Sequence, residues 1–512
     1  MTWTPTALMP QQIEGLRRCE GKNGFGLLME QGTGKTLTLL EEAMGLYATD
    51  QIDALIVLAP NGVHENWVLN EIPTHAPEDF PLLCAYYVSD GASNRREKRA
   101  IADVVTPTKG EDPVFRVLTC NYESLLTDAC FKLVETFARN FRCMIIADES
   151  QKIKNPDSRR TKRAMNLRKH CSPRRIATGT AIINSPLDAF SQFEFIGSGL
   201  LGTTSFAAFR REFCVLLTQN HGVARHLTDR LIRARGLKNV TPELREKMTP
   251  AIIRQDELGR PMYKNLDKLH SMIAKHSYRV LKEDCLDLPP KVYETRYFHL
   301  TSKQRGVYER MEEDLRYTLE NGMELITTKL VAMSKLRQIT SGFVLMRDGN
   351  VSYVEDNPRI ELLRASIEEE EQQGIIWSQY KEEQRNIHKM IRKLGKTVDV
   401  VNGETPMKRR REIMAEFQAG NLQWIAAHPA TMGSGFTLTA AKIIYYYSNG
   451  FSLEERLQSE DRSHRIGTVG SVLYRDLVAI DTRDDDVVWA ADTQGARRSG
   501  APESDRPWAC EA

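Results

Sequence analysis

The feature that most constrains the fold is a repeated alternation of short apolar runs with longer amphipathic stretches. The amphipathic stretches, such as LTLLEEAMGLYA and SLLTDACFKLVETFARN, have the hydrophobic spacing of helices. The apolar runs have the length of strands and are bounded by polar residues, Gly or Pro; in the first part of the chain they occupy 24–29, 54–60, 115–120, 141–147 and 174–179. This alternation is typical of a parallel sheet with helices on both faces, so we predict an α/β fold.

The alternation lapses between about residues 203 and 276 and then returns. The later strands are predicted at 293–300, 374–380, 397–403, 423–428, 442–448 and 472–478. Because 512 residues exceed what one hydrophobic core usually organises, we expect two or three domains. The predicted limits are an N-terminal lobe at 1–215, an insertion and linker at 216–276, a C-terminal lobe at 277–480 and a poorly ordered tail at 481–512.

The predicted insertion is locally basic in a chain that is nearly neutral. Segment 216–260 carries nine Arg and Lys against five Asp and Glu, whereas the whole chain has a net charge of +2. We expect this segment to form helices and a hairpin that project from the first sheet. Its charge fits a solvated surface insertion and a surface that faces a polyanion equally well.

Composition indicates an ordinary soluble protein of a reducing compartment. Hydrophobic residues make up 41% and charged residues 27% of the chain. The nine cysteines are spread singly without a CxxC pair, which argues against a disulfide framework or a zinc site. The N-terminus lacks the pattern of a signal peptide, and the longest apolar runs are too short to span a bilayer. We therefore expect a soluble, intracellular protein.

The sequence GFGLLMEQGTGKT predicts a phosphate-binding loop (P-loop) between a strand and a helix. Gly32 and Gly34 allow backbone N–H groups to close around phosphate oxygens at the N-terminus of the helix. Lys35 is placed to reach the β- and γ-phosphates, and the Thr36 hydroxyl to ligate Mg²⁺. Met29 stands where such loops usually begin with Gly, so the generic pattern is incomplete.

The sequence FRCMIIADES supplies the acidic partner of that loop. A continuous apolar strand delivers Asp148 and Glu149 to the carboxyl edge of the sheet, where ligands of α/β folds bind. Asp148 is placed to hold Mg²⁺, and Glu149 to orient and deprotonate an attacking water. The loop and the acidic pair together predict nucleotide hydrolysis.

The remaining motifs follow one another in a fixed order. They are LMPQQIEGL, LIVLAPNGVHENWVLNEI, VLTCNYESL, DESQKIKNPDSRRTKRA, IATGTAIINSPLDAF, IIWSQY, VVNGETPMKRRREIMAEF, HPATMGSGFTLTAA and QSEDRSHRIG. With these motifs the chain resembles the Swi/Snf-type family of superfamily-two helicase-like ATPases, from about residue 8 to residue 480. The resemblance implies two RecA-like lobes, ATP and Mg²⁺ as cofactors, and a monomeric core.

The resemblance also assigns roles to individual residues. The nucleotide-binding set comprises Gln12, which would contact adenine, with Gly32, Thr33, Gly34, Lys35, Thr36, Gly433 and Gln458. The set that would couple hydrolysis to domain movement comprises Gln151, Thr178, Gly179 and Thr180. Arg462 and Arg465 would act as arginine fingers supplied by the second lobe, so that hydrolysis depends on closure of the two lobes. Gln151 stands where many relatives have His, and Thr437 where many have Asn.

Double-stranded DNA is the partner that the resemblance implies, although motif spacing alone equally allows RNA or single strands. Candidate contacts to its phosphates are Asn61, Tyr122, Lys154, Lys408 and Arg409. The run 409–411 fits an exposed helix face and a phosphate clamp equally well. Trp67 is expected to be a core residue rather than a base-stacking platform.

The expected function is therefore an ATP-dependent DNA translocase that hydrolyses ATP on duplex DNA without obligatory strand separation. The alternatives are a strand-separating DNA or RNA helicase, an ATP-dependent clamp that binds without turnover, and, more distantly, a metabolic P-loop kinase. The compact form resembles prokaryotic or phage relatives, so we expect a cytoplasmic location, or a nuclear one if the source is eukaryotic.

Overall fold

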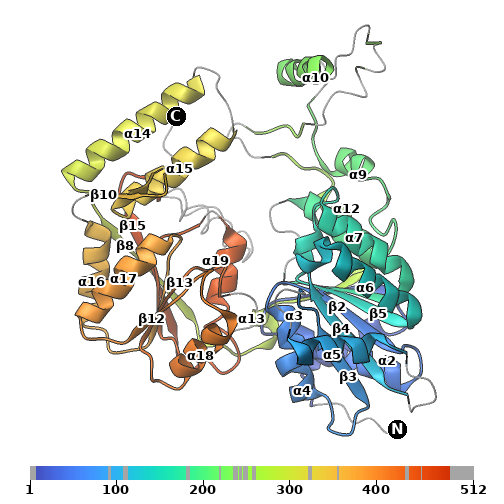
Figure 1. Cartoon of the computed structure of the whole chain (residues 1–512). Helices are drawn as coiled ribbons and strands as arrows, with labels where there is room; N and C mark the ends of the chain where they lie inside the picture. The colour runs from blue at the N-terminus through green and yellow to red at the C-terminus, as the bar shows by residue number, and fades with distance from the viewer. Residues whose placement is uncertain are drawn as a thin grey trace. The chain divides into compact units, whose positions relative to one another are not determined.

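The computed structural model describes two compact units, Met1–Cys285 and Leu286–Ala512, each built around its own sheet (Figure 1). The described residues are 7–484 except 90–93, 108–112, 180–184, 218–220, 235–239, 242–244, 246–251, 257–260, 321–325, 347, 355–356, 433–436 and 451. The expected tail at 481–512 therefore lies almost entirely outside the described residues.

The first unit contains a seven-stranded parallel sheet in the order β3-β4-β2-β5-β6-β1-β7. Its strands are β1 (Gly24–Met29), β2 (Ala54–Ala59), β3 (Leu82–Tyr86), β4 (Phe115–Asn121), β5 (Cys143–Asp148), β6 (Cys171–Ala177) and β7 (Ser277–Val280). In a parallel sheet all carboxyl ends lie at one edge, so the loops that follow β1, β5 and β6 are neighbours. The predicted α/β class is confirmed for this unit.

Helices cover both faces of the first sheet, because alternate side chains of each buried strand point to opposite sides. On one face Ile56 of β2 packs with residues of α6 (Asp128–Asn140), α7 (Arg159–Leu167), α8 (Ala189–Ile196), α9 (Phe206–Phe213) and α12 (Leu266–Lys275). On the other face Val57 packs with residues of α1 (Pro10–Cys19), α2 (Lys35–Ala48), α3 (Val63–Asn66), the π-helix η1 (Trp67–Glu71) and α4 (Ile72–His75). Helix α5 (Arg95–Val105) packs beside β3 and β4.

The described part of the insertion contains a helix and antiparallel pairing. Helix α10 spans Gly222–Ala234. Isolated antiparallel bridges join Cys214 to Tyr263 and Leu216 to Ile253. These elements agree with the expected helices and hairpin.

The boundary of the second domain differs from the expected one. We placed it at residue 277, but β7 pairs in parallel with β1 and so completes the first sheet. The short helix α13 (Lys282–Cys285) also belongs to the first unit, and the division falls before Leu286. The polar residues of SYRV hid this edge strand from a prediction based on apolar runs.

The second unit contains a six-stranded parallel sheet in the order β12-β13-β11-β14-β15-β8. Its strands are β8 (Lys291–Phe298), β11 (Gly374–Trp377), β12 (Val398–Val401), β13 (Trp424–Ala427), β14 (Ile443–Tyr446) and β15 (Val472–Ala479). Its helices are α14 (Ser302–Glu320), α15 (Ile326–Thr340), α16 (Pro358–Glu368), α17 (Lys381–Lys393), α18 (Met407–Gln418) and α19 (Leu453–Glu460). A two-stranded antiparallel ribbon of β9 (Phe343–Leu345) and β10 (Val351–Tyr353) completes the unit.

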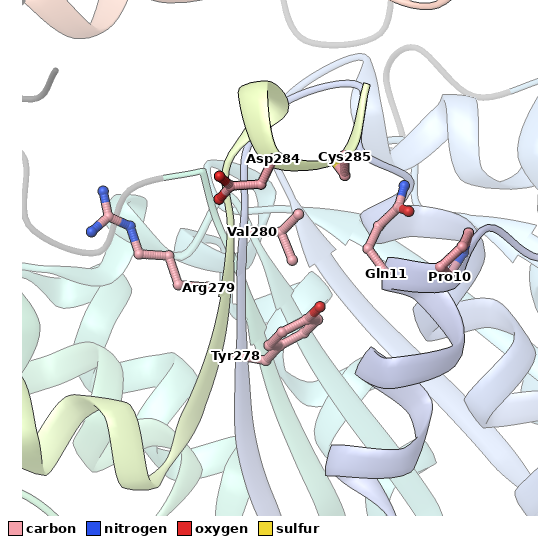
Figure 2. Close-up of a pocket in the computed structure, with 7 residues that line it drawn as sticks. All are labelled: Pro10, Gln11, Tyr278, Arg279, Val280, Asp284 and Cys285. Carbon is pink, nitrogen blue, oxygen red and sulfur yellow. The ribbon is translucent and has the colours of Figure 1, made fainter. Parts of the chain in front are cut away.

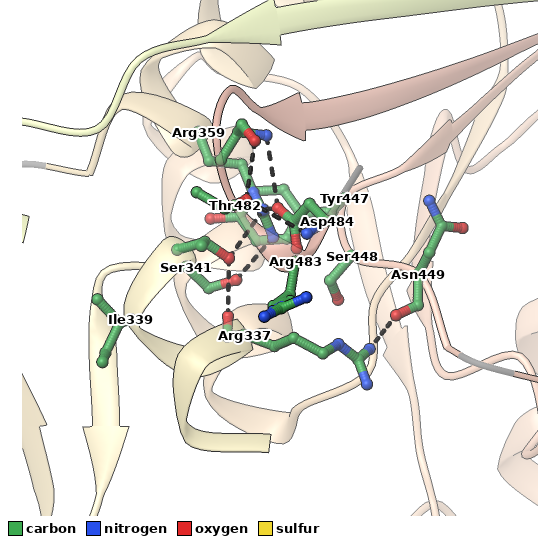
Figure 3. A network of polar contacts seen from close by, with 12 residues as sticks. Arg337, Ile339, Ser341, Arg359, Tyr447, Ser448, Asn449, Thr482, Arg483 and Asp484 are labelled. Carbon is green, nitrogen blue, oxygen red and sulfur yellow. Dashed lines mark hydrogen bonds and ion pairs between the residues drawn. The ribbon is translucent and has the colours of Figure 1, made fainter. Parts of the chain in front are cut away.

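A buried arginine joins the end of the described chain to the second unit (Figure 3). The Arg359 side chain is 1% exposed and donates to Ser341 Oγ at 2.9 Å and Thr340 Oγ1 at 3.0 Å. It also pairs with the Asp484 carboxylate and lies 5.5 Å from the centre of the Tyr447 ring. These contacts satisfy a charge that would otherwise be costly to bury.

Within the described part of the chain, no helix has both the length and the apolar character needed to cross a bilayer.

The packing of β1 against α8 is tested by two matched glycine substitutions. A Cβ added to Gly24 lies 2.1 Å from the Ile196 carbonyl oxygen, whereas one added to Gly45 in α2 meets nothing within 4 Å. We expect Gly24→Ala to destabilise the first unit by about 1–3 kcal/mol through overpacking. We expect Gly45→Ala to be neutral or to stabilise it by up to about 1 kcal/mol, since Ala favours helix. Urea unfolding of both variants measures the difference; equal midpoints would contradict this packing.

Candidate active site

The loop between β1 and α2 is closed by two glycines in left-handed conformations. Gly32 has φ 83° and Gly34 has φ 96°, values that side-chain-bearing residues rarely adopt. A Cβ at Gly34 would lie 2.2 Å from Gln12 Nε2, so this position also lacks room for a side chain. The loop delivers Lys35 and Thr36 to the first turn of α2. Its backbone therefore has the form that anion-binding loops at helix N-termini require.

Hydrogen bonds from the loop itself and from α1 hold this loop in place. The Thr33 hydroxyl donates to Glu30 O at 2.7 Å. Gln11 Nε2 donates to Thr33 O at 3.4 Å, and Gln12 Nε2 donates to Gly34 O at 3.2 Å. Gln12, which we expected to contact adenine, thus anchors the loop in this structure.

Lys35 closes the base of the loop. Its side chain is largely buried, and Nζ donates to the Met29 carbonyl oxygen at 2.7 Å. Only the main chain of Met29 takes part in this contact. The departure from the usual glycine at Met29 therefore leaves the lysine anchor unchanged.

Asp148 ends β5 as a buried carboxylate with donors on both oxygens. Oδ2 accepts from the Trp67 indole at 3.0 Å, and Oδ1 accepts from the Glu149 backbone N–H at 3.0 Å. Burial and then the Glu149 charge raise the pKa of Asp148 to about 6, while the Trp67 hydrogen bond and the nearby Lys35 act in the opposite direction. A cation beside this carboxylate would favour its charged form.

Glu149 is held between the loops that follow β1 and β5. Its backbone is left-handed, with φ 49°, a strained conformation for a residue with a side chain. Its Oε1 accepts from Gln31 Nε2 at 3.3 Å, and its Oε2 accepts from Gln151 Nε2 at 2.8 Å. The carboxylate is thereby oriented by one residue of the phosphate loop and by one of the expected coupling residues.

The segment after β6 lies directly against the phosphate loop. The Thr178 backbone N–H donates to Leu27 O at 3.2 Å. A Cβ at Gly179 would lie 3.5 Å from Glu30 Cα and 3.8 Å from Gln31 N. The expected coupling residues Thr178 and Gly179 thus neighbour the loop, whereas Thr180 lies outside the described residues.

A cavity of about 430 Å³ opens beside the phosphate loop. Its lining comes from α1, β7 and α13 and comprises Pro10, Gln11, Tyr278, Arg279, Val280, Asp284 and Cys285 (Figure 2). Gln11 joins this cavity to the loop through its bond to Thr33 O. Its volume is in the range of small-ligand sites, and the mixture of an aromatic ring with polar groups suits a nucleobase.

The residues at the loop also fit Mg²⁺. The Thr36 hydroxyl and the Asp148 carboxylate are the oxygen ligands that this ion prefers, and it commonly binds through one or two protein groups together with phosphates. Within the described residues, no group of three or more His, Cys, Asp and Glu side chains forms a separate metal site. The donor set is therefore that of a metal bound together with its nucleotide.

The two expected arginine fingers follow α19 in the second unit and differ in exposure. Arg462 is 5% exposed, and its carbonyl oxygen accepts from Leu438 N at 2.9 Å. Arg465 is only partly buried, and its Nη1 donates to Thr437 Oγ1 at 3.0 Å. The departure at Thr437 therefore supplies an oxygen that orients Arg465. Gln458 lies on α19.

Gly433, which we expected to contact the nucleotide, lies outside the described residues.

Buried ion pairs fix α19 to the second sheet. Arg456 pairs with Asp476 at 2.6 Å and with Glu460 at 2.8 Å, and its guanidinium lies 3.4 Å from the centre of the Tyr446 ring. Glu460 also accepts from Lys291 Nζ of β8 at 2.9 Å. The backbone that carries the two arginines therefore starts from a rigid support.

The residues expected to contact nucleic acid fall into three groups, according to the exposure and the partners of their side chains. Asn61 and Lys408 are exposed. Lys154 lies 3.4 Å from Asp188, and Arg409 pairs with Asp399 at 2.6 Å and with two glutamates, so both charges are partly compensated. Tyr122 is fully buried, and its hydroxyl donates to Asp148 O at 2.8 Å.

The placement of Tyr122 corrects the expectation of a surface contact. Because its ring fills the core behind β5, the side chain is not available to a phosphate. It supports the catalytic strand instead.

Comparison with known proteins decides the family. The SNF2-related domain matches residues 12–343, and the helicase conserved C-terminal domain matches residues 358–467. The first match covers more than half of the chain. The chain belongs to the SNF2-related family. It is thus a helicase-like ATPase by family, as the motif order predicted.

The curated SNF2 relatives are longer than this chain. A Caenorhabditis elegans SWI/SNF-related regulator of chromatin subfamily A-like protein 1 homolog is 26% identical over 94% of this chain and 60% of its own length. A putative ATP-dependent helicase/translocase of Bacillus subtilis is 22% identical over 91% of this chain and 45% of its own. The DNA annealing helicase and endonuclease ZRANB3 of Mus musculus is 23% identical over 97% and 41%. The chain spans about half the length of these relatives.

Among solved structures, the Sulfolobus solfataricus SWI2/SNF2 ATPase core in complex with dsDNA is 23% identical, with a TM-score of 0.39 over 95% of this chain and 92% of that chain.

Sequence reasoning missed two contacts of the SNF2 site, those of Trp67 with Asp148 and of Gln31 with Glu149. Trp67 was expected in the core, where it lies, but its bond to Asp148 depends on how η1 packs against the end of β5. Gln31 was not among the expected site residues, although it contacts Glu149. The signal for this contact in the sequence was that Gln31, a polar residue, stands between Glu30 and Gly32 in MEQG.

The Trp67 contact is tested by Trp67→Phe, which keeps an aromatic ring and removes the N–H donor to Asp148. Partners of this kind typically change metal affinity or activity by about 10–100-fold. We expect the Mg²⁺ concentration that half-saturates ATP hydrolysis to rise about tenfold. The control is Trp377→Phe, because the equally buried Trp377 indole has no hydrogen-bond partner among the described residues. Identical Mg²⁺ curves for the two variants would show that the indole does not support the metal ligand.

Proposed function

We propose that this chain hydrolyses ATP when it is bound to double-stranded DNA and uses the cycle to move along the duplex without obligatory strand separation. The observation that carries the proposal is the meeting of the loops after β1 and β5 at Glu149. Gln31 and Gln151 orient its carboxylate, while Lys35 and Asp148 lie in the adjoining loop and strand end. This arrangement provides a phosphate cradle, a metal ligand and a general base at one sheet edge.

The residues of the first unit have distinct roles in the proposed reaction. Lys35 releases Met29 O and binds the terminal phosphates. Thr36 and Asp148 would hold Mg²⁺, which supplies charge neutralisation to the β- and γ-phosphates. Glu149 accepts the proton of the attacking water, and its two glutamine partners keep the carboxylate directed toward the phosphate.

In this proposal the second unit contributes a further positive charge at the transition state. Arg465 is the better placed of the two arginines, since it is partly exposed whereas Arg462 is buried. An arginine supplied in this way typically accelerates hydrolysis by about 10³–10⁵-fold. Dependence on both units is what would convert hydrolysis into movement along a polymer.

The adenine and ribose would occupy the cavity formed by α1, β7 and α13. Tyr278, whose ring also lies 4.7 Å from the Arg18 guanidinium, is the proposed stacking residue, and Gln11 and Asp284 are polar residues of the same cavity lining (Figure 2). Gln11, which lines this cavity, also donates to Thr33 O of the phosphate loop, and this contact supports a base site next to the loop. In this proposal Gln11 contacts the nucleotide, and Gln12 fixes the loop backbone.

Duplex DNA is supported as the polymer by the names of the relatives. ZRANB3 is named a DNA annealing helicase, and the Caenorhabditis elegans relative is named a homolog of a regulator of chromatin. In this chain, Asn61 and Lys408 are exposed candidates for contacts to phosphates. Contacts of this type are independent of base sequence and weaken with salt.

The main test measures ATP hydrolysis without polymer and with duplex DNA, single-stranded DNA or RNA. We expect strong stimulation by duplex DNA, because hydrolysis is coupled to its binding. Lys35→Ala removes the phosphate contact and should abolish hydrolysis, while Lys381→Ala, an exposed lysine on α17, should behave as wild type. Equal rates with every polymer and with none would overturn the proposal.

A second assay separates translocation from unwinding. A translocase removes the third strand of a DNA triplex and leaves a forked duplex paired, whereas separation of the forked duplex would favour the helicase alternative.

The cavity is tested by Tyr278→Ala. Stacking of a base on an aromatic ring contributes about 1–3 kcal/mol, and about 1.4 kcal/mol corresponds to a tenfold change in affinity. We expect KM for ATP to rise about tenfold or more with little change in kcat, because the base is bound equally in ground and transition states. Tyr297→Ala, which removes an exposed tyrosine of β8, is the matched control. An unchanged KM in Tyr278→Ala would place the base elsewhere.

A further inference from the structure

Positive charge is concentrated in one segment directly after the catalytic strand. Residues 150–175 contain ten Lys and Arg and one acidic residue, Asp157. Residues 150–175 therefore have nine more basic than acidic side chains. Because the net charge of the whole chain is +2, all other residues together carry −7. A local excess of this size in a nearly neutral chain indicates a surface for a polyanion.

Four of these ten cations are compensated by acidic side chains. Arg175 forms a buried pair with Glu42, and Arg163 pairs with Asp128. The other two pairs are Arg160 with Glu123 at 3.6 Å and Lys154 with Asp188 at 3.4 Å.

Four others are exposed, and within the described residues none of them forms an ion pair with an acidic side chain. They are Lys152, Arg159, Lys162 and Lys169, which we call the α7 basic face. Lys169 donates only to the neutral Asn166 side chain, at 3.2 Å. These side chains are free to bind an external anion.

The fold of α7 explains why these cations share a surface. Thr161, Ala164 and Leu167 are buried against the sheet, so the helix turns Arg159 and Lys162 outward. These two are about one turn apart, and Lys169 lies beyond the end of α7, in the 3-10 helix η4 (Arg168–His170). No large hydrophobic side chain in the described residues 150–175 is among the exposed ones, so the face lacks the apolar groups with which a protein enters a lipid surface.

Contacts with the segment after β4 connect this face to the proposed DNA-binding edge of the sheet. Arg160 lies beside Glu123, and Arg163 Nη1 donates to Leu125 O at 2.8 Å. That segment follows the carboxyl end of β4, which pairs with β2 next to Asn61. The basic face is thus adjacent to the loops at which we propose phosphate contacts.

We propose that the α7 basic face binds the phosphodiester backbone of a nucleic-acid duplex, in addition to the loops that carry Asn61 and Lys408. Along α7, from Arg159 to Leu167, the helical rise is about 12 Å, which matches the axial rise of roughly three to four base pairs, and Lys169 follows in the 3-10 helix η4 (Arg168–His170). Arg159, Lys162 and Lys169 therefore track several phosphates of one duplex. Flexible side chains without a fixed acidic partner suit contacts that ignore base sequence. This inference rests on the proposed DNA-dependent function, since it extends the same interface.

The experiment measures duplex binding without nucleotide over a series of KCl concentrations. The test variant is Arg159→Ala/Lys162→Ala/Lys169→Ala; Lys152 is left intact because it follows Gln151 directly. The control, Arg95→Ala/Arg96→Ala/Arg99→Ala, removes three exposed cations from α5 of the same unit. Each lost phosphate contact lowers the slope of log affinity against log salt by about 0.9. We expect the magnitude of this slope to be smaller by about 2–3 in the test variant, and its duplex affinity at low salt to be weaker by about tenfold or more. We expect the control to keep the wild-type slope.

Two further measurements test the importance of charge and the class of the partner. The charge-preserving variant Arg159→Lys/Lys162→Arg should keep the wild-type slope, because charge is what the duplex needs. Binding to poly-glutamate tests an acidic protein as the partner. A wild-type slope in the triple-alanine variant overturns the proposal, whether or not poly-glutamate binding is lost.

The outcome is distinguishable from failure of the proposed function. If duplex DNA does not stimulate wild-type hydrolysis, the proposed function fails. If it does, and the triple-alanine variant binds the duplex with an unchanged salt slope, only the role of the α7 basic face fails.

Discussion

The site depends on one polar contact, in which Gln31 of the phosphate loop reaches the Glu149 carboxylate at the end of β5. This contact is possible because β1, β6 and β5 are neighbours in parallel register, so the loops at their carboxyl ends converge. The left-handed backbone of Glu149 costs on the order of 1–3 kcal/mol. The hydrogen bonds from Gln31 and Gln151 help to offset this cost and keep the carboxylate oriented.

Around that contact the first unit has a glycine-closed loop, a buried metal-ligand candidate and the cavity that we propose for the base. The second unit is arranged differently. Its ion pairs around Arg456 and Glu460 hold α19 against the sheet, and the two arginines follow that helix. A nucleotide could therefore bind to the first unit alone, whereas the proposed chemistry requires a cation from the second. In the proposed function, hydrolysis depends on a polymer because the reaction needs residues of both units.

The sequence predicted most of the central strands, because β1, β2, β4 and β5 are fully or almost fully buried and read as continuous apolar runs. It did not predict β3 and β7, which lie at the two edges of the first sheet and are only partly buried. The main chain of the phosphate loop was predictable because glycine spacing dictates it. The contacts of Trp67 and Tyr122 with Asp148 were not, since they depend on how segments distant in sequence pack behind β5.

In the proposed function, the first unit binds ATP and the second unit supplies the arginine that completes hydrolysis. This claim is tested most directly by single-turnover hydrolysis in Arg465→Ala on saturating duplex DNA, beside equilibrium binding of a fluorescent ATP analogue to the same variant. We expect nearly unchanged nucleotide affinity and a hydrolysis rate lower by about 10³-fold or more. Wild-type single-turnover hydrolysis in Arg465→Ala, or a loss of nucleotide binding large enough to explain the slower rate, would contradict the claim.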